Sequence, residues 1–281
     1  MSSLYDTGIR PAIDAYLKEK SEEVRSYGEY WSASSAGYCM RLNIMRRLGV
    51  PKVPELADNA TQTRIFEAGH IFHEWLQRIT KNAGLSIASE VELQDEDLMI
   101  RGHFDDLVLS SYDESGEQAR AGDEIRAQHL ILYDYKTAHS ASFNYKKDQP
   151  MGYYHKMQLG TYMYMLRQRN TLKHELYDGI ESLSEARILS ISKDDLRLDE
   201  KQLLWTPELS DEVLKYWQTL NKYWTDKKLP LCTCLDHDGG FMGKRSKKGK
   251  IYCDYYWNDQ CCSLEWYNKC KADGWKPRHD K

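Results

Sequence analysis

The period of the hydrophobic pattern changes along this chain, and this change constrains the fold more than any other feature of the sequence. Residues 61–83 place apolar side chains every three or four positions, which predicts an amphipathic helix that Gly84 can end. Its apolar stripe consists of Ile65, Gly69, Phe72, Leu76 and Ile79. The next apolar segments, 85–93, 98–109 and 129–137, are rich in Ile, Leu, Val and Tyr, which predicts strands.

Shorter patterns on either side predict further helices. We expect an amphipathic helix over 4–26, and a short helix that is capped by Ser34 or Ser35, carries Cys39 and stops at Gly49. A helix that begins at Pro150 is expected over 150–169, and Thr206 with Pro207 is expected to open another. Strands are expected at 185–192 and 196–205. This order predicts a mixed α/β fold in which helices flank a central mixed sheet, and not a regular doubly wound fold.

The composition agrees with a soluble globular chain. Its 281 residues are 41% hydrophobic and 29% charged, so the chain can build a core without disulfides. No uncharged apolar stretch approaches the length of about 18 residues that a membrane helix needs. The first residues, MSSLYDTGIR, show no leader pattern. We therefore expect a cytoplasmic protein without a membrane partner, or one of the host-cell cytoplasm if the source is viral.

Charge is unevenly distributed along the chain. The formal net charge of −4 gives no general basic signature for nucleic acid. From Lys227 onward, however, twelve Lys and Arg residues stand against seven Asp and Glu residues. The densest basic cluster is Lys244, Arg245, Lys247, Lys248 and Lys250. It is either a DNA-backbone contact or a solvated loop.

The cysteines gather near the C-terminus. Six of the seven lie between residues 232 and 270, and only Cys39 lies elsewhere. An odd number of cysteines in a chain expected to be cytoplasmic argues against a disulfide framework and favours metal ligands, although some of the thiols are expected to be inert.

Four ionisable side chains lie where a core would normally be apolar. Asp134 and Lys136 share one face of a predicted strand, Asp105 lies inside the preceding strand, and His73 borders the stripe of the 61–83 helix. Taken singly, each is more readily an ion pair, a turn residue or a core histidine. Together they supply two carboxylates, an imidazole and a cation, a set that suits a divalent metal and phosphodiester hydrolysis.

Four motifs follow one another in the order GHIFHEW, GHFDDLV, YDYKT and QLGTYMYML. In this order they resemble the signatures of the PD-(D/E)XK nuclease superfamily, and more closely those of its RecB-like exonuclease branch. The matching residues are Gly69 with His73, Gly102 with Asp105, Asp134 with Lys136, and Gln158 with Tyr162. The resemblance implies a restriction-endonuclease-like core and a metal-dependent deoxyribonuclease that acts on DNA ends or single strands.

The resemblance also implies a role for each matched residue. The implied ligands of Mg²⁺ or Mn²⁺ are His73, Asp105, Asp134 and the backbone carbonyl of Tyr135. Lys136 would position or activate the attacking water and stabilise developing charge. Gln158 and Tyr162, one helical turn apart, would steady the site or contact the DNA backbone. Tyr154, one turn earlier, either joins them or is a core residue.

The cysteines extend the resemblance to nucleases similar to the CRISPR-adaptation exonucleases and the AddB nuclease domain. In these, one cysteine before the catalytic motifs and three after them hold a [4Fe–4S] cluster. Here CDYYWNDQCC places Tyr256 where the middle cysteine of the C-terminal motif would stand. The implied ligands are Cys39, Cys253, Cys262 and Cys234, with Cys232 as the alternative to Cys234. Zinc would bind four thiolates equally well on chemical grounds.

These expectations divide the chain into three regions. Residues 1–60 would form a helical region that contributes Cys39, residues 61–228 the nuclease core, and residues 229–281 a small cysteine-rich region stapled by metal. The expected partner is DNA, joined by recombination or CRISPR-adaptation proteins if the chain works in a larger complex. Two alternatives remain: a nuclease subunit that is active only in a larger complex, and a non-catalytic cysteine-metal module that binds DNA.

Overall fold

The computed structural model describes residues 9–22, 28–50, 60–112, 127–168, 183–230 and 271–277. Its helices are α1 (Ile9–Glu22), α2 (Met40–Arg47), α4 (Ala60–Asn82), α5 (Ser140–Lys147), α6 (Tyr153–Arg167) and α7 (Pro207–Thr225), with a 3₁₀ turn at Ala33–Ser35. Its strands are β1 (Trp31–Ser32), β2 (Ser86–Asp95), β3 (Ile100–Tyr112), β4 (Ala127–Ala138), β5 (Glu185–Ser192), β6 (Leu198–Leu204), β7 (Lys228–Leu229) and β8 (Lys276–Pro277). No helix in these ranges is long and apolar enough to cross a membrane.

The central sheet is mixed, as the sequence predicts. Its order is β1-β3-β4-β5-β6, and β2 pairs with β3 outside this path. The β1–β3 and β4–β5 pairs are parallel, whereas β2–β3, β3–β4 and β5–β6 are antiparallel. Strand β3 pairs with β1 at Ile100 and Arg101, and with β4 only from Asp106 onward. Residues 102–105 therefore form a short gap between these two partners.

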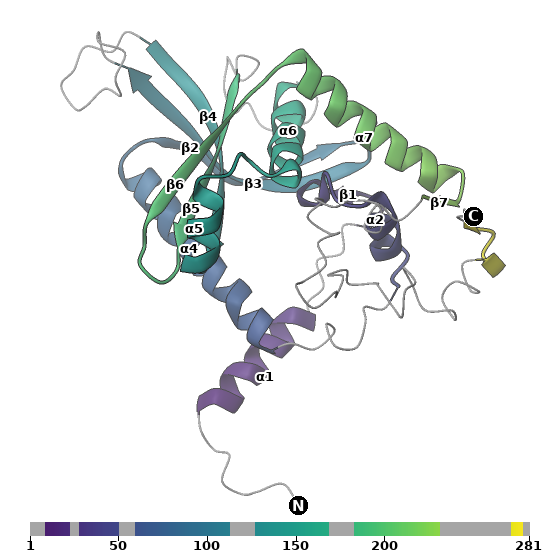
Figure 1. Ribbon diagram of the computed structural model, residues 1–281, viewed down its shortest axis with the longest axis horizontal. Coiled ribbons are helices and arrows are strands. Elements are labelled where there is room, and N and C mark those ends of the chain that lie inside the picture. Colours follow the sequence, from purple (N-terminus) through teal and green to yellow (C-terminus); the bar gives the residue numbers. More distant parts are fainter. Residues whose placement is uncertain are drawn as a thin grey trace, which may run out of the picture.

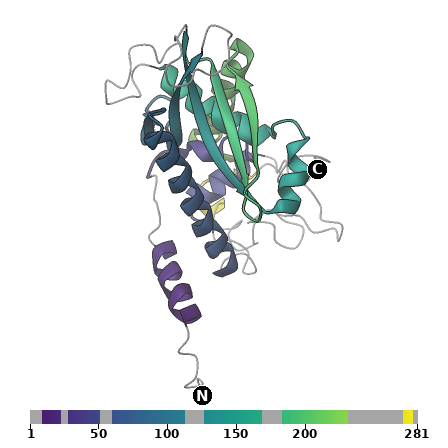
Figure 2. The same cartoon turned by 90° about the vertical axis from the view of Figure 1, so that its left-hand side faces the viewer.

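Helices α4 and α6 cover opposite faces of the sheet. Neighbouring residues of a strand point to opposite faces. On β4, Asp134 contacts Gln158 of α6, and the ring of Tyr135 contacts His73 of α4. Figures 1 and 2 show α4 running along the sheet and continuing beyond it, where α1 packs against its first half.

Helix α6 is the central element of the core. It is buried on almost every side, including Met157, Leu159, Met163 and Leu166, which are each 0% exposed. Helix α7 crosses it closely because α6 has no side chain at Gly160. A Cβ atom there would lie 3.0 Å from both Leu209 and Val213 of α7.

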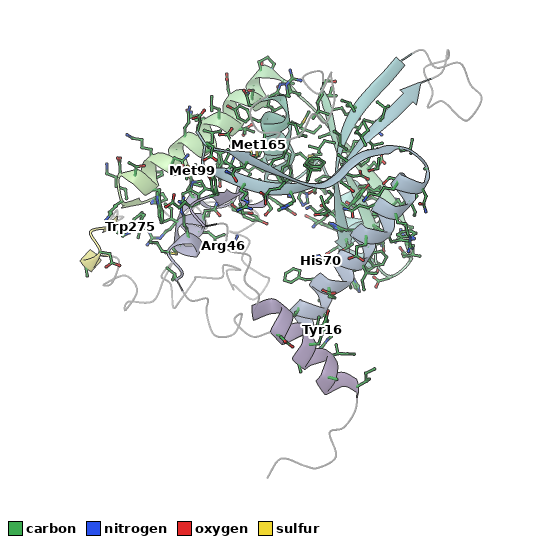
Figure 3. The ribbon with its side chains drawn as sticks, turned by 180° about the vertical axis from the view of Figure 1, so that it is seen from behind. Tyr16, Arg46, His70, Met99, Met165 and Trp275 are labelled. Carbon is green, nitrogen blue, oxygen red and sulfur yellow. The ribbon has the colours of Figure 1, made fainter. Side chains whose placement is uncertain are left out.

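The last described residues pack against α7 and β7 at one corner of the molecule. Strand β8 pairs in parallel with β7, and Trp275 lies 5.3 Å from Trp224 of α7, measured between ring centroids. Trp31 and Trp224 pack edge to face, with the guanidinium of Arg47 4.3 Å from each ring. Residues far apart in sequence are thus joined beside α2 (Figures 1 and 3).

Several local expectations were wrong. Cys39 does not lie inside a helix but caps the N-terminus of α2, because Ser34 and Ser35 belong to the preceding 3₁₀ turn. Gly152, and not Pro150, precedes α6, and α5 was not expected from the sequence. Ile65 and Ile79, assigned to the apolar stripe of α4, are 47% and 45% exposed, because the sheet covers only part of that helix.

Candidate active site

Two strands and two helices bring together His73 from α4, Asp105 from β3, Asp134 with Lys136 from β4, and Gln158 from α6. Nδ1 of His73 lies 3.5 Å from Oδ1 of Asp105, and Nζ of Lys136 lies 2.7 Å from Oδ2 of Asp134. Nε2 of Gln158 donates a hydrogen bond to Oδ1 of Asp134 at 2.9 Å. Residues from positions 73 to 158 therefore meet at the gap between β3 and β4.

Asp105 lies where the ladder between these strands stops. Its Oδ2 accepts a hydrogen bond from the backbone N–H of Tyr135 at 2.6 Å, so the side chain replaces a carbonyl of the missing ladder. Gln77, one turn after His73 on α4, donates to the backbone carbonyl of Asp105 at 3.0 Å and to Oε1 of Glu90 at 2.9 Å. These contacts fix both the backbone and the carboxylate of Asp105.

Asp134 and Lys136 form a largely buried ion pair. The Asp134 side chain is 5% exposed and that of Lys136 is 31% exposed. Burial raises the pKa of Asp134, the charge of Lys136 opposes this shift, and the charge of Asp105 adds to it. Burial would lower the pKa of Lys136, but the charges of Asp134 and Asp105 raise it above its usual value. The lysine is therefore an ammonium ion at neutral pH.

His73 is held between Asp105 and the sheet. Burial would lower its pKa, but the hydrogen bond and charge of Asp105 outweigh burial and raise it. The imidazole also packs edge to face on the ring of Tyr135, with 5.9 Å between ring centroids. Gly69, one turn earlier, faces β4, where a Cβ atom would make an ordinary contact of 3.4 Å with Oγ1 of Thr137.

The two residues expected to act together on α6 have different surroundings. Gln158 contacts Asp134 directly, as described above. Tyr162 is 3% exposed and packs against the backbone at Gly102, where a Cβ atom would lie 3.2 Å from the Tyr162 hydroxyl oxygen and 2.7 Å from Cβ of Ala33. Tyr162 thus fills the gap in the sheet behind the site.

Several residues at the site were missed by sequence reasoning. Asp106 is 0% exposed and accepts hydrogen bonds from the hydroxyls of Thr80 at 2.6 Å, Ser86 at 2.5 Å and Tyr135 at 2.8 Å. A second carboxylate next to Asp105 inside an apolar strand was a usable signal for it. Gln77 could also have been found, because it follows His73 by one helical turn.

Tyr38 was missed without any available signal, because it lies in the turn before α2. Its ring stacks on Tyr154 of α6, with 5.8 Å between centroids and 21° between planes. Tyr154 also contacts the ring of His155. Arg46 lies over the ring of Tyr38, with its Cζ 5.6 Å from the ring centroid. Tyr154, left open from the sequence, therefore stacks on Tyr38 one helical turn before Gln158.

The donor set suits a hard divalent cation. Among the described residues, no three His, Cys, Asp or Glu side chains converge as a ready-made cage. Nonetheless, Asp105 and Asp134 are close enough for one charge to raise the pKa of the other carboxyl group. Oδ2 of Asp134 is buried and, apart from the Lys136 ion pair, has no hydrogen-bond partner among the described residues. A cation would relieve both costs.

The remaining predicted site residues fall into two groups. Cys39 is buried and carries a free thiol at the N-terminus of α2. The other predicted thiolates and the basic cluster lie outside the described residues: Cys232, Cys234, Cys253, Cys262, Lys244, Arg245, Lys247, Lys248 and Lys250.

Comparison with known proteins finds distant structural likenesses. No family model matches the chain, and no curated protein matches it. The crystal structure of SSO0001 is 17% identical with a TM-score of 0.44, over 77% of this chain and 88% of that one. LHK-Exo in complex with dAMP is 16% identical with a TM-score of 0.42, over 71% and 89%. The LHK-Exo alkaline exonuclease from Laribacter hongkongensis, in another structure, is 16% identical with a TM-score of 0.39, over 70% and 88%.

Proposed function

We propose that this protein hydrolyses phosphodiester bonds in DNA, as an exonuclease that uses Mg²⁺ or Mn²⁺ and acts on ends or single strands. The observation that supports this proposal is the buried Asp134–Lys136 ion pair beside the Asp105–His73 pair. The charge of Asp105 makes ionisation of Asp134 less favourable, and two such carboxylates next to a buried cation form an unfavourable arrangement for a core. The same arrangement suits a metal and an anionic substrate.

In this proposal the metal would be held by Asp105, Asp134 and His73, together with the carbonyl of Tyr135. When bound, such an ion polarises a phosphate oxygen and acidifies a water molecule. Asp105 reaches the site only because Tyr135 N–H and Gln77 hold it in place. Gln158 keeps Oδ1 of Asp134 occupied, which leaves Oδ2 for the cations. Tyr162 supports the backbone at Gly102.

Lys136 would act as a cation beside the metal site. In the metal-free protein, burial would lower the pKa of its amine, but the charges of Asp134 and Asp105 raise it above its usual value. The Lys136 side chain is 31% exposed and lies beside the buried carboxylate of Asp134. Its ammonium group can therefore donate hydrogen bonds to a phosphate oxygen or to the attacking water. It would therefore stabilise the charge that develops during hydrolysis.

A cleavage assay on the purified full chain tests this function. Linear double-stranded and single-stranded DNA would be incubated with Mg²⁺, Mn²⁺ or EDTA, with closed circular DNA as the substrate that lacks ends. We expect metal-dependent loss of the linear substrates only, and a rate at least about a hundredfold lower for Lys136→Gln. Full activity of Lys136→Gln and Asp105→Ala would show that the site is wrongly assigned.

The same assay separates the two rival functions. A non-catalytic DNA-binding module would bind DNA without cleaving it under any metal. A subunit of a larger recombination or CRISPR-adaptation assembly would be inactive alone and gain activity when its partners are added. Closed circular DNA degraded as fast as linear DNA would replace the exonuclease assignment with an endonuclease.

We also propose that Cys39 binds a [4Fe–4S] cluster together with Cys253, Cys262 and Cys234, or Cys232 in place of Cys234. Two contacts support an arrangement near α2. Nη1 of Arg41, two residues after Cys39, donates to the carbonyl of Pro230 at 3.3 Å, and β7 pairs with β8. The described residues on either side of 231–270 therefore lie close together beside α2.

Anaerobic purification tests the cluster. We expect a brown protein that contains iron, and a colourless one after Cys39→Ala. Cys261→Ala and Cys270→Ala serve as matched controls and should keep the colour. A colourless protein with stoichiometric zinc would show a four-thiolate zinc site instead.

The basic cluster at Lys244–Lys250 is proposed to contact the DNA backbone. Neutralising Lys247 and Lys248 should weaken binding to every sequence and lower the salt dependence of log Kd by roughly one to two units of slope. An unchanged slope would assign the segment to solvent.

A further inference from the structure

Four planar side chains form a continuous column at the edge of the candidate active site. They come from α2, the turn before it and the start of α6, in the order Arg46, Tyr38, Tyr154 and His155. The contacts measure 5.6 Å from Arg46 Cζ to the Tyr38 centroid, 5.8 Å between the two tyrosine rings, and 3.8 Å between Tyr154 and His155. Two separate parts of the chain must be held together for this column to form.

The fold holds these two parts together tightly. Gly37, with φ +76°, brings the turn so close to α6 that a Cβ atom would lie 2.9 Å from Met157 and 3.0 Å from the Tyr154 backbone. On the other side, the hydroxyl of Tyr216 in α7 donates to the carbonyl of Tyr38 at 2.9 Å. Asn43 donates to the Tyr216 hydroxyl at 2.9 Å and to the Ser35 carbonyl at 3.1 Å. The position of Tyr38 is therefore preorganised.

The column borders the catalytic ion pair. Tyr154 lies one helical turn before Gln158 on α6, and Gln158 donates to Asp134 at 2.9 Å. Burial raises the pKa of Tyr154, and the charges of Tyr38 and Asp134 add to this shift. Burial, together with the charges of Lys136 and Lys146, lowers the pKa of His155 to about 3. At the other end of the column, Arg46 is exposed.

Arg46 differs from its neighbour in a way that suggests a ligand. Arg47 is enclosed by Trp31 and Trp224 and serves the packing of the corner. Arg46 instead lies over the face of one tyrosine and remains exposed to solvent (Figure 3). An arginine oriented by an aromatic ring, with phenol hydroxyls nearby, has the donors that phosphate groups require.

We propose that this column binds the scissile DNA strand, with Arg46 and the hydroxyls of Tyr38 and Tyr154 contacting the phosphate next to the one that is cleaved. The inference rests on the proposed function, because it assigns the path of the strand through that same site. In this arrangement the DNA strand would run from Lys136 toward α2. The tyrosine faces are covered within the column, so it would offer its ring edges and hydroxyls to the strand, and the arginine would supply the charge.

The test measures binding apart from cleavage. A fluorescent single-stranded oligonucleotide would be titrated with the full chain in EDTA, which stops the metal-dependent reaction, at several salt concentrations. Arg46→Gln is expected to weaken binding about tenfold and to reduce the slope of log Kd against log salt by about one. Tyr38→Phe and Tyr154→Phe keep the rings and should each weaken binding about threefold.

Lys222→Gln is the matched control. This lysine of α7 is 77% exposed and lies 3.8 Å from Asp226, so its loss changes the net charge by the same amount as Arg46→Gln. It should leave Kd and slope at wild-type values. In the cleavage assay, Arg46→Gln should raise KM about tenfold and change kcat by less than about twofold. Thermal midpoints would be compared to confirm that each variant is folded.

The outcomes separate this inference from the proposed function. If the wild-type chain cleaves DNA but Arg46→Gln matches Lys222→Gln in Kd, slope and KM, the strand contact is wrong and the hydrolysis stands. If binding depends on Arg46 but no DNA is cleaved with Mg²⁺ or Mn²⁺, the contact stands and the hydrolysis is wrong.

Discussion

The carboxylate of Asp105 accepts the backbone N–H of Tyr135 at 2.6 Å, at the point where β3 and β4 stop pairing. One side chain therefore completes the sheet and faces the candidate metal site. Its other oxygen, Oδ1, lies 3.5 Å from His73. The structural and catalytic roles of Asp105 can be tested separately. Asparagine keeps an oxygen that can accept the hydrogen bond from Tyr135, but it loses the negative charge.

We expect Asp105→Asn to lower the cleavage rate at least about a hundredfold, because the metal loses a carboxylate ligand. Its free energy of unfolding should stay within about 1 kcal/mol of wild type. Asp105→Ala should lose the same activity and a further 1–3 kcal/mol or so, because the N–H of Tyr135 then has no acceptor. Urea denaturation and single-turnover cleavage would measure both effects. Equal stability of the two variants would contradict the structural role.

The Tyr135 hydroxyl donates to buried Asp106 at 2.8 Å, and the same ring supports His73. Tyr135→Phe should lower the free energy of unfolding by about 1–2 kcal/mol and reduce kcat more than KM. Tyr133→Phe on the same strand is the control, because its hydroxyl lies 3.4 Å from Glu200 in an exposed contact. The control should cost less than about 0.5 kcal/mol. A loss of equal size in the two variants would show that Asp106 does not anchor the ring.

Two glycines of the sequence motifs should respond differently to alanine. Gly102→Ala would place a Cβ atom 2.7 Å from Ala33 and 3.2 Å from Tyr162, so we expect a loss of about 1–3 kcal/mol. Gly69→Ala meets only Oγ1 of Thr137 at 3.4 Å, an ordinary contact, and should gain up to about 1 kcal/mol of helix propensity. Thermal denaturation of both variants decides this. A destabilised Gly69→Ala variant would mean that α4 lies closer to β4 than described.

His155 should make stability fall in acid. Its pKa is about 3 in the folded protein against an ordinary value of 6.5, so below about pH 6.5 the unfolded chain binds a proton that the folded chain does not. As the pH falls from about 6.5 to 5, the free energy of unfolding of the wild-type protein should decrease. The decrease per pH unit should be about 1 kcal/mol larger than in His155→Gln. Urea denaturation in EDTA at pH 7, 6 and 5 measures the difference. Parallel pH curves for the two proteins would contradict a buried neutral imidazole.

Local chemistry determined much of this protein from the sequence alone. Long runs with one period specified α4, the sheet strands and α7, whose Thr206 cap and following Pro207 were correctly predicted. The mixed sheet follows from the order of these elements. The spacing of Asp134 and Lys136 placed both on one face of β4, and the structure pairs them. In each case the signal is carried by residues within a turn or a strand of one another.

Tertiary structure alone decided which of these residues meet. Residues 102–105 of β3 have no partner on the edge that β1 and β4 share, because β1 pairs with Ile100 and Arg101 and β4 pairs only from Asp106 onward. No local pattern in the sequence predicts this unpaired stretch. Tyr162 and Gln158 share one face of α6 but reach different targets, because the gap lies beside one and Asp134 beside the other. Tyr38 enters the site through contacts with α6 and α7, more than a hundred residues away. Periodicity reports which face of an element is buried, but only the packed fold determines what that face touches.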